Sequence, residues 1–175
     1  LKFYILNVKK IISIGAVVVA AVLLVYGFVL IRQIFSANTK LYYLDIGDID
    51  SVWYLNLSNN PNLRYLEADS MRLAEWWLTL HPNAITNLIY LDIEDNGFET
   101  FDFSDYTNLK FLLIPENSFT TIDISSNTAL RLIDVESNEL EQLVTNYNTF
   151  LEEIKASYNS LTSIDVSNNL LLSRL

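Results

Sequence analysis

The chain has 175 residues, of which 51% are hydrophobic, and it carries no cysteine and a formal charge of −10 at pH 7. The absence of cysteine excludes a disulfide framework and a thiol nucleophile. Residues 1–40 hold five Lys or Arg and no acid, whereas residues 41–175 hold six Lys or Arg and all 21 Asp or Glu. The second part therefore has a formal charge of −15, which argues against nucleic acid as a partner.

An apolar segment follows a short basic N-terminal segment, residues 1–10. From Ile11 to Ile31 the chain has 21 residues without a charge, and a helix of that length spans about 31 Å, the thickness of a hydrocarbon core. The pattern predicts a single transmembrane helix at residues 11–35, surrounded by membrane lipid. A cleaved signal peptide is the alternative, although the apolar run is longer than a typical signal-peptide core.

Basic residues on the two sides of the apolar segment indicate its orientation. Three Lys precede the segment, and Arg32 and Lys40 follow it. By the positive-inside rule, residues 1–10 are predicted to lie in the cytoplasm. The rest of the chain is then extracytoplasmic, either periplasmic or on the cell surface.

Small residues recur along one side of the predicted helix. Ser13, Ala16, Ala20 and Gly27 fall at helical spacing, and small side chains allow a second helix to approach closely. We expect these residues to form a packing face for an integral membrane subunit. The alternative is that Ala and Gly are simply common in membrane helices.

After a short linker, residues 36–40, the chain repeats itself with a period of 21 residues. Leucine recurs at this step at Leu88, Leu109, Leu130, Leu151 and Leu172, and asparagine recurs at Asn96, Asn117, Asn138 and Asn159. Each unit holds two strand-like phrases of alternating apolar residues. Such a period is typical of a solenoid, in which the buried asparagine amides are expected to bond backbone groups at the corners. Asn127, Asn148 and Asn169 form a second column.

The phrases IDISSNTALRLIDVESN (Ile122 to Asn138) and SLTSIDVSNNLLL (Ser160 to Leu172) carry a family resemblance. They resemble the leucine-rich repeats of the bacterial 21-residue variety, which is internalin-like or Bacteroidetes-type. The resemblance implies a mainly β, leucine-rich-repeat solenoid of about five to six coils over residues 41–175, preceded by the transmembrane helix. Relatives often place Cys where this chain has Ile93, Ile114, Val135 and Ala156.

One unit, which begins at Leu63, is longer than the others, because the next unit begins only at Leu88. The additional residues fall in His81–Asn87, where Pro82 and two Asn predict a surface loop. Trp77 lies just before this insertion and is a candidate for contact with a partner or with the lipid interface. A Trp packed over the loop is the alternative.

The outward positions of the first phrase predict a binding surface. One column of outward residues reads Tyr65, Tyr90, Phe111, Leu132 and Glu153, and acids such as Glu67 and Asp92 flank it. Aromatic anchors within a charged rim are typical of protein-binding surfaces. The alternative is that the rings stack only to stabilise the sheet. A further acidic column, Asp102, Asp123 and Asp165, is expected to be solvated, with calcium left open.

No catalytic constellation, metal-ligand spacing or cofactor motif occurs, because the only His lies at a repeat corner and no phosphate-binding loop is present. The sequence therefore predicts a protein without enzymatic activity. We interpret it as a membrane-tethered binding or scaffolding module, which acts as an accessory subunit of a membrane complex. A surface adhesin is the first alternative, and a pilin-like filament subunit is the second. The apolar end, LLLSRL, predicts that further chain or a partner covers the last coil.

Overall fold

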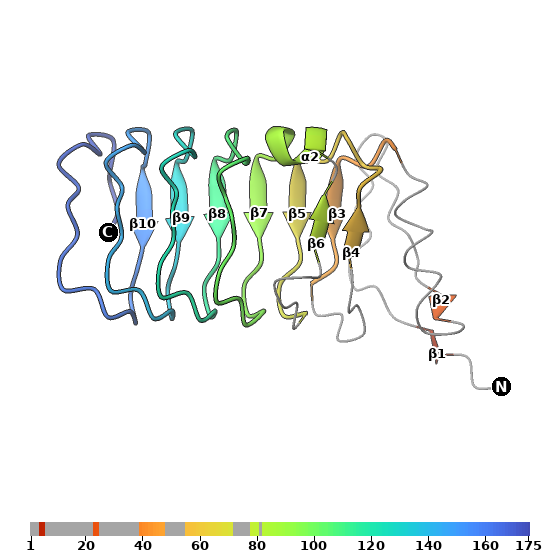
Figure 1. The fold of residues 1–175 in the computed structure, drawn as a ribbon, viewed down its shortest axis with the longest axis horizontal. Helices are drawn as coiled ribbons and strands as arrows, with labels where there is room; N and C mark the ends of the chain where they lie inside the picture. Colours follow the sequence, from red (N-terminus) through yellow and green to blue (C-terminus); the bar gives the residue numbers. More distant parts are fainter. Residues whose placement is uncertain (1–3, 6–22, 25–38, 48–54, 72–77, 81) are drawn as a thin grey trace.

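The structure is a computed structural model that describes residues 4–5, 23–24, 39–47, 55–71, 78–80 and 82–175. Its main feature is a parallel sheet of six short strands, in the order β10-β9-β8-β7-β5-β3, which runs along the length of a solenoid (Figure 1). The strands are β3 (Tyr43–Asp45), β5 (Tyr65–Glu67), β7 (Tyr90–Asp92), β8 (Phe111–Leu113), β9 (Leu132–Asp134) and β10 (Glu153–Lys155). The prediction of a mainly β solenoid is confirmed. Its regular part, from Leu88 onward, makes about four turns, and β5 and β3 extend the sheet beyond it.

The register of the sheet follows the sequence repeat. Tyr90 pairs with Phe111, and Phe111 pairs with Leu132, each 21 residues further along the chain. The middle residue of every strand points inward and is buried, as Leu91 and Leu112 are, with no exposed surface. The first and last residues point to the other face, because side chains alternate along a strand.

The second phrase of each unit forms strands only at the N-terminal end of the solenoid. There β4 (Leu55–Leu57) pairs in parallel with β6 (Leu78–Leu80). From Phe98 onward the second phrase contains no described strand, and the prediction of two strands per unit is wrong there. The reason is that neighbouring coils are joined at this place by a single backbone bond each, such as Ser118 N to Phe98 O at 2.8 Å. Apolar residues of the phrase are still buried or partly buried, as Phe98 and Phe101 are.

The insertion before Leu88 is helical. Residues Pro82–Asn87 form α2, a helix of six residues, where a loop was predicted. Proline at the first position of a helix is favourable, because its ring fixes the helical φ and its missing N–H is not needed there. The proline that indicated a loop therefore begins a short helix.

Asparagine amides join the coils at both corners, as predicted. Asn117 is buried, and its Nδ2 donates to the carbonyl oxygens of Ile93 at 3.0 Å and Pro115 at 3.0 Å, while its Oδ1 accepts from the backbone N–H of Phe98 at 2.9 Å. In the second column, Asn148 Nδ2 donates to Ile124 O and Asn127 O, both at 2.9 Å. The first-column amide Asn117 thus satisfies backbone groups of its own coil and of the preceding coil, whereas the second-column amide Asn148 donates only to the preceding coil.

The segment predicted to cross the membrane lies almost entirely outside the described residues. Within 11–35 only Leu23–Leu24 are described, and they form the two-residue strand β2, which pairs antiparallel with β1 (Tyr4–Ile5). These two residues are therefore not helical. In the sequence Leu23–Leu24 are flanked by Val22 and Val25, and β-branched residues favour extended backbone as well. Within the described ranges, no helix has the length and apolar character needed to cross a membrane.

We expect replacement of Asn117 by Ala to lower the free energy of unfolding by about 3 kcal/mol, because several buried backbone groups lose their partner at once. Urea unfolding of the two proteins measures the difference. Asn108 is the matched control, since it is exposed and its Nδ2 makes one bond, to Thr86 O at 2.6 Å. Asn108→Ala should cost less than about 1 kcal/mol. An equal loss in both variants would contradict the role of the buried column.

Candidate protein-binding surface

The open face of the six-stranded sheet carries a row of aromatic side chains. These are the first residues of β3, β5, β7 and β8, and we call them the aromatic column: Tyr43, Tyr65, Tyr90 and Phe111. All four are half-buried. Successive ring centroids lie 6.3, 6.3 and 6.2 Å apart in tilted arrangements, and Tyr42 adds a fifth ring at 5.4 Å from Tyr65.

Acidic side chains end most of the same strands. We call the set at the last strand positions the acidic edge: Asp45, Glu67, Asp92 and Asp134. Two tyrosine hydroxyls of the aromatic column donate to it, Tyr43 to Glu67 Oε1 at 2.9 Å and Tyr90 to Asp92 Oδ2 at 3.3 Å. These bonds hold the Tyr43 and Tyr90 rings in place, so part of the column is ordered before any partner arrives.

Burial and crowding raise several pKa values at this edge. Desolvation raises the pKa of Asp92, and the nearby Asp69 carboxylate raises it further, although the backbone N–H of Glu94 opposes the change. The pKa of Glu94 is also raised, first by burial and then by Asp92. The pKa of Tyr90 is raised by burial and by the Asp92 charge, so its hydroxyl keeps its proton and remains a donor. The edge is therefore a region of concentrated negative charge.

Basic residues lie on the opposite side of the face. They were not among the residues predicted from the sequence to form the binding surface. Arg64, Lys110 and Arg131 directly precede β5, β8 and β9. Their place could have been read from the repeat, because each stands one position before a residue of the outward column. The sheet face thus has positive charge at the start of its strands and negative charge at their ends.

Ion pairs neutralise the C-terminal end of the face. Lys155 Nζ lies 3.0 Å from Asp134 Oδ2, and Arg174 Nη1 lies 3.1 Å from Glu153 Oε2. A third pair joins Arg131 to Glu152 at 3.0 Å. This end of the sheet therefore differs from the N-terminal end, where rings and acids dominate.

The structure brings together four of the five residues predicted to bind a partner. Tyr65, Tyr90, Phe111 and Leu132 occupy paired positions on neighbouring strands, and Leu132 is half-buried like the rings. Trp77 lies outside the described residues, as do the predicted helix-packing residues Ser13, Ala16, Ala20 and Gly27.

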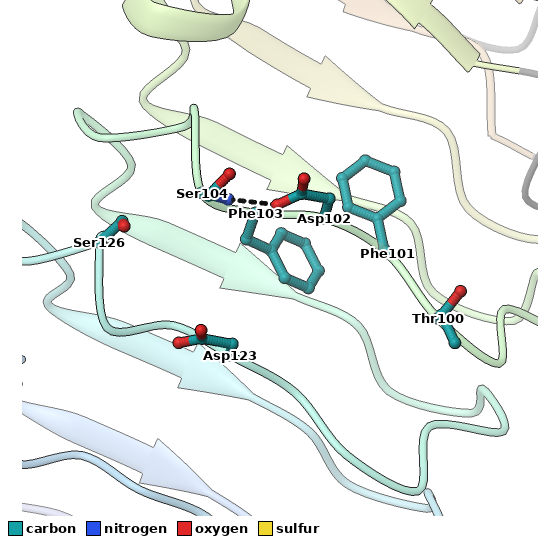
Figure 2. A pocket seen from close by; sticks show the side chains of 7 residues that line it. All are labelled: Thr100, Phe101, Asp102, Phe103, Ser104, Asp123 and Ser126. Atoms are coloured by element: carbon teal, nitrogen blue, oxygen red, sulfur yellow. Dashed lines mark hydrogen bonds between the residues drawn. The ribbon is translucent and has the colours of Figure 1, made fainter.

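A shallow depression on another side of the solenoid is the second candidate surface. It has a volume of about 310 Å³ and is lined by Thr100, Phe101, Asp102, Phe103, Ser104, Asp123 and Ser126 (Figure 2). Its carboxylates serve the local turns, because Asp102 Oδ1 accepts from the Ser104 N–H and Asp123 Oδ1 accepts from the Ser125 N–H, both at 2.9 Å. These bonds from Ser104 and Ser125 lower the pKa values of Asp102 and Asp123. In the described residues no three His, Asp or Glu side chains are grouped to hold a metal ion.

Exposed apolar side chains near the C-terminal end were also not predicted. Val144 is 54% exposed and stands at the position that Asp123 and Asp165 hold in the neighbouring coils. Tyr147 and Phe150 follow it and are 61% and 55% exposed. A comparison of the repeats reveals them, since polar or small residues stand at these places in the preceding coil.

Two solved structures are similar to the fold of this chain. The chain is similar to the functional domain of InlJ from Listeria monocytogenes, with 26% identity, a TM-score of 0.72 and coverage of 81% of this chain. The fold is of the leucine-rich-repeat type. The crystal structure of Listeria monocytogenes InlP is also similar, with 25% identity, a TM-score of 0.66 and coverage of 78%. The chain spans 30% of the InlJ chain and 39% of the InlP chain.

The InlJ domain differs from this chain in its cysteine content. The InlJ domain is described as including a cysteine ladder, whereas this chain has no cysteine. In this leucine-rich-repeat solenoid, Ile93, Ile114 and Val135 stack at one buried position, with no exposed surface. No protein-family model matches the chain, and the search of curated proteins also finds no match.

We expect Asp92→Asn to stabilise the protein at pH 7. A carboxyl whose pKa is higher in the folded state than in the unfolded state binds a proton more readily when folded, so its contribution to stability falls as the pH rises through that range. Asn keeps an oxygen that can accept from the Glu94 N–H, whose distance to Asp92 Oδ1 is 3.1 Å, but it carries no charge. Thermal unfolding of both proteins between pH 4 and pH 7 measures the gap between their melting temperatures, with the variant melting higher. This gap should widen toward neutral pH. A gap that narrows toward pH 7 would contradict the direction of the pKa shift.

Proposed function

We propose that this chain is a protein-binding module without catalytic activity, and that the open face of its sheet receives the partner. The observation that carries the proposal is the aromatic column, whose rings are half-buried and regularly spaced, and of which Tyr43 and Tyr90 are held by hydrogen bonds to the acidic edge. Tyrosine is enriched among the residues that dominate binding energy at interfaces, because its ring buries a large area with little loss of conformational freedom.

Similarity to internalins supports this proposal, since such solenoids are typically binding scaffolds and not enzymes. The partner-binding residues are then Tyr65, Tyr90, Phe111 and Leu132. We assign Trp77 to the same role because it lies close to the insertion in the sequence. Both a surface adhesin and an accessory subunit of a membrane complex are compatible with such a module, and they differ in whether the partner is a foreign ligand or a membrane protein of the same cell.

Photocrosslinking from two phenylalanine positions tests the proposed face. A photoreactive phenylalanine analogue is placed either at Phe111, on the sheet face, or at Phe150, which is 55% exposed elsewhere on the solenoid. After irradiation with the surface and membrane fraction of the native cells, we expect a discrete crosslinked protein from position 111 and none from position 150. Affinity for the isolated partner should fall by about thirtyfold in Tyr90→Ala, as for a residue that dominates an interface.

Two results would overturn this assignment. The first is crosslinking from position 150 alone, which would place the interface elsewhere. The second is unchanged affinity in the double variant Tyr65→Ala with Tyr90→Ala, provided that its unfolding midpoint is also unchanged. That outcome would mean that the rings serve only to stabilise neighbouring strands.

We further propose that residues 11–35 tether the module to a membrane, with the repeats outside the cytoplasm. Leu23–Leu24 form a strand in this structure, so the proposal requires that the segment becomes one helix in the lipid. The uncharged run from Ile11 to Ile31 supports this proposal, because its length matches a hydrocarbon core. Ser13, Ala16, Ala20 and Gly27 then provide the packing face for an integral subunit.

An alkaline wash of membranes that contain the full chain tests the tether. The unchanged chain should stay with the lipid, whereas Val18→Lys combined with Val22→Lys should release it, because a charge at the centre of a bilayer costs about 3 kcal/mol. Val8→Lys, before the segment, is the matched control and should stay. If the tether holds, Ala20→Leu with Gly27→Leu should remove any co-purifying subunit. Full release of the unchanged chain by the wash would refute the tether.

A further inference from the structure

The sheet face has a shape that suits an extended segment better than a globular surface. Its strands are three residues long, and six of them at about 4.8 Å spacing give a face of roughly 24 Å by 10 Å. A typical interface covers about 800 Å² on each partner, which is several times this area. A single extended chain that crosses the strands fills the face with about seven residues.

The rings form a continuous row along the path of such a chain. The Tyr65 and Tyr90 centroids are 6.3 Å apart, and those of Tyr90 and Phe111 are 6.2 Å apart. Strands recur every 4.8 Å or so, whereas side chains on one face of an extended peptide recur every 6.6 Å or so, so the two repeats do not coincide. The segment therefore lies along the row of rings without a fixed pairing of its side chains to single rings.

The charges of the sheet face determine which side chains of the bound segment are favoured. Asp92 is mostly buried and accepts from Tyr90, and no Lys or Arg of the described residues lies within ion-pair distance of it. Two strands further on, the equivalent carboxylate of Asp134 is paired with Lys155. The chain thus supplies a cation for this column at its C-terminal end.

We propose that the aromatic column and the acidic edge bind an extended protein segment in which Lys or Arg alternates with apolar residues. This inference rests on the proposed function and adds the chemistry of the partner. The aliphatic stem of each basic side chain lies along a tyrosine ring, and its charged head reaches the acidic edge at Asp92. A cation over an aromatic ring adds a further attraction.

The basic residues of the face determine how the segment lies. Arg64 and Lys110 precede β5 and β8 and repel a second cation there, so the basic heads of the partner turn toward the ends of the strands. Acidic segments meet the opposite arrangement. They are repelled by Glu67, Asp92 and Glu94, where the Glu67 charge already raises the pKa of Asp92 and the Asp92 charge raises the pKa of Glu94.

Three capped peptides of about eight residues, long enough to cross the sheet, test the proposal on the full chain. They alternate Val with Lys, with Gln or with Glu, and backbone amide shifts in NMR spectra report both affinity and location. We expect the Lys peptide to bind about tenfold more tightly than the Gln peptide, with the largest shifts at Tyr65 and Tyr90. High salt should reduce this advantage, because it screens exposed charges.

Asp92→Asn is the decisive variant, since it removes one charge from the acidic edge and is expected to fold stably. It should remove most of the advantage of the Lys peptide, whereas Asp123→Asn, at the depression of Figure 2, should leave the advantage unchanged. Equal affinity for the Lys and Gln peptides, tighter binding of the Glu peptide, or no binding of any of them overturns the inference. The photocrosslink at position 111 still tests the face independently, so a partner captured there without any dependence on Asp92 leaves the proposed function intact.

Discussion

Burial of the backbone at the corners is the constraint on which the whole solenoid depends. A coil must turn twice within 21 residues, and its turning backbone leaves N–H and C=O groups that no strand ladder reaches. Asn96, Asn117 and Asn138 satisfy these groups at one corner, and Asn127 and Asn148 satisfy them at the other. Because every one of these amides bonds to the preceding coil, the residues that satisfy the corners also stack the coils.

Satisfied corners leave the sheet face free to vary. Inward residues such as Leu91 and Leu112 are confined by packing, whereas outward residues bear no such restriction and change from rings to ion pairs along the sheet. Local stability and surface chemistry are therefore determined by different positions of the same repeat. At Asp92 surface chemistry opposes local stability. The raised pKa of Asp92 shows this, since the carboxylate is held where burial disfavours its charge.

The sequence alone predicted the solenoid, the stacked asparagines and the aligned outward residues, because each follows from a period of 21. It failed where the period does not determine the backbone. Pro82 fits both a loop and a helix start, and Phe98 is buried without a strand around it. Positive φ angles were also missed at Asp95, Glu116 and Tyr158, with values of 48°, 53° and 56°. Those residues share a place in the repeat but not a residue type, so no composition signal marks it.

The fixed register of the parallel sheet has a consequence for how such a surface can evolve. Tyr90, Phe111 and Leu132 are aligned because each coil has the same length. A tandem duplication of one whole coil therefore lengthens the face by one row, about 4.8 Å, and leaves every existing column continuous. The copied coil already contains the asparagines that satisfy its corners, so its outward residues can be changed by selection without loss of the turns. Reach and specificity can thus be changed by copying a unit, without redesign of the interior.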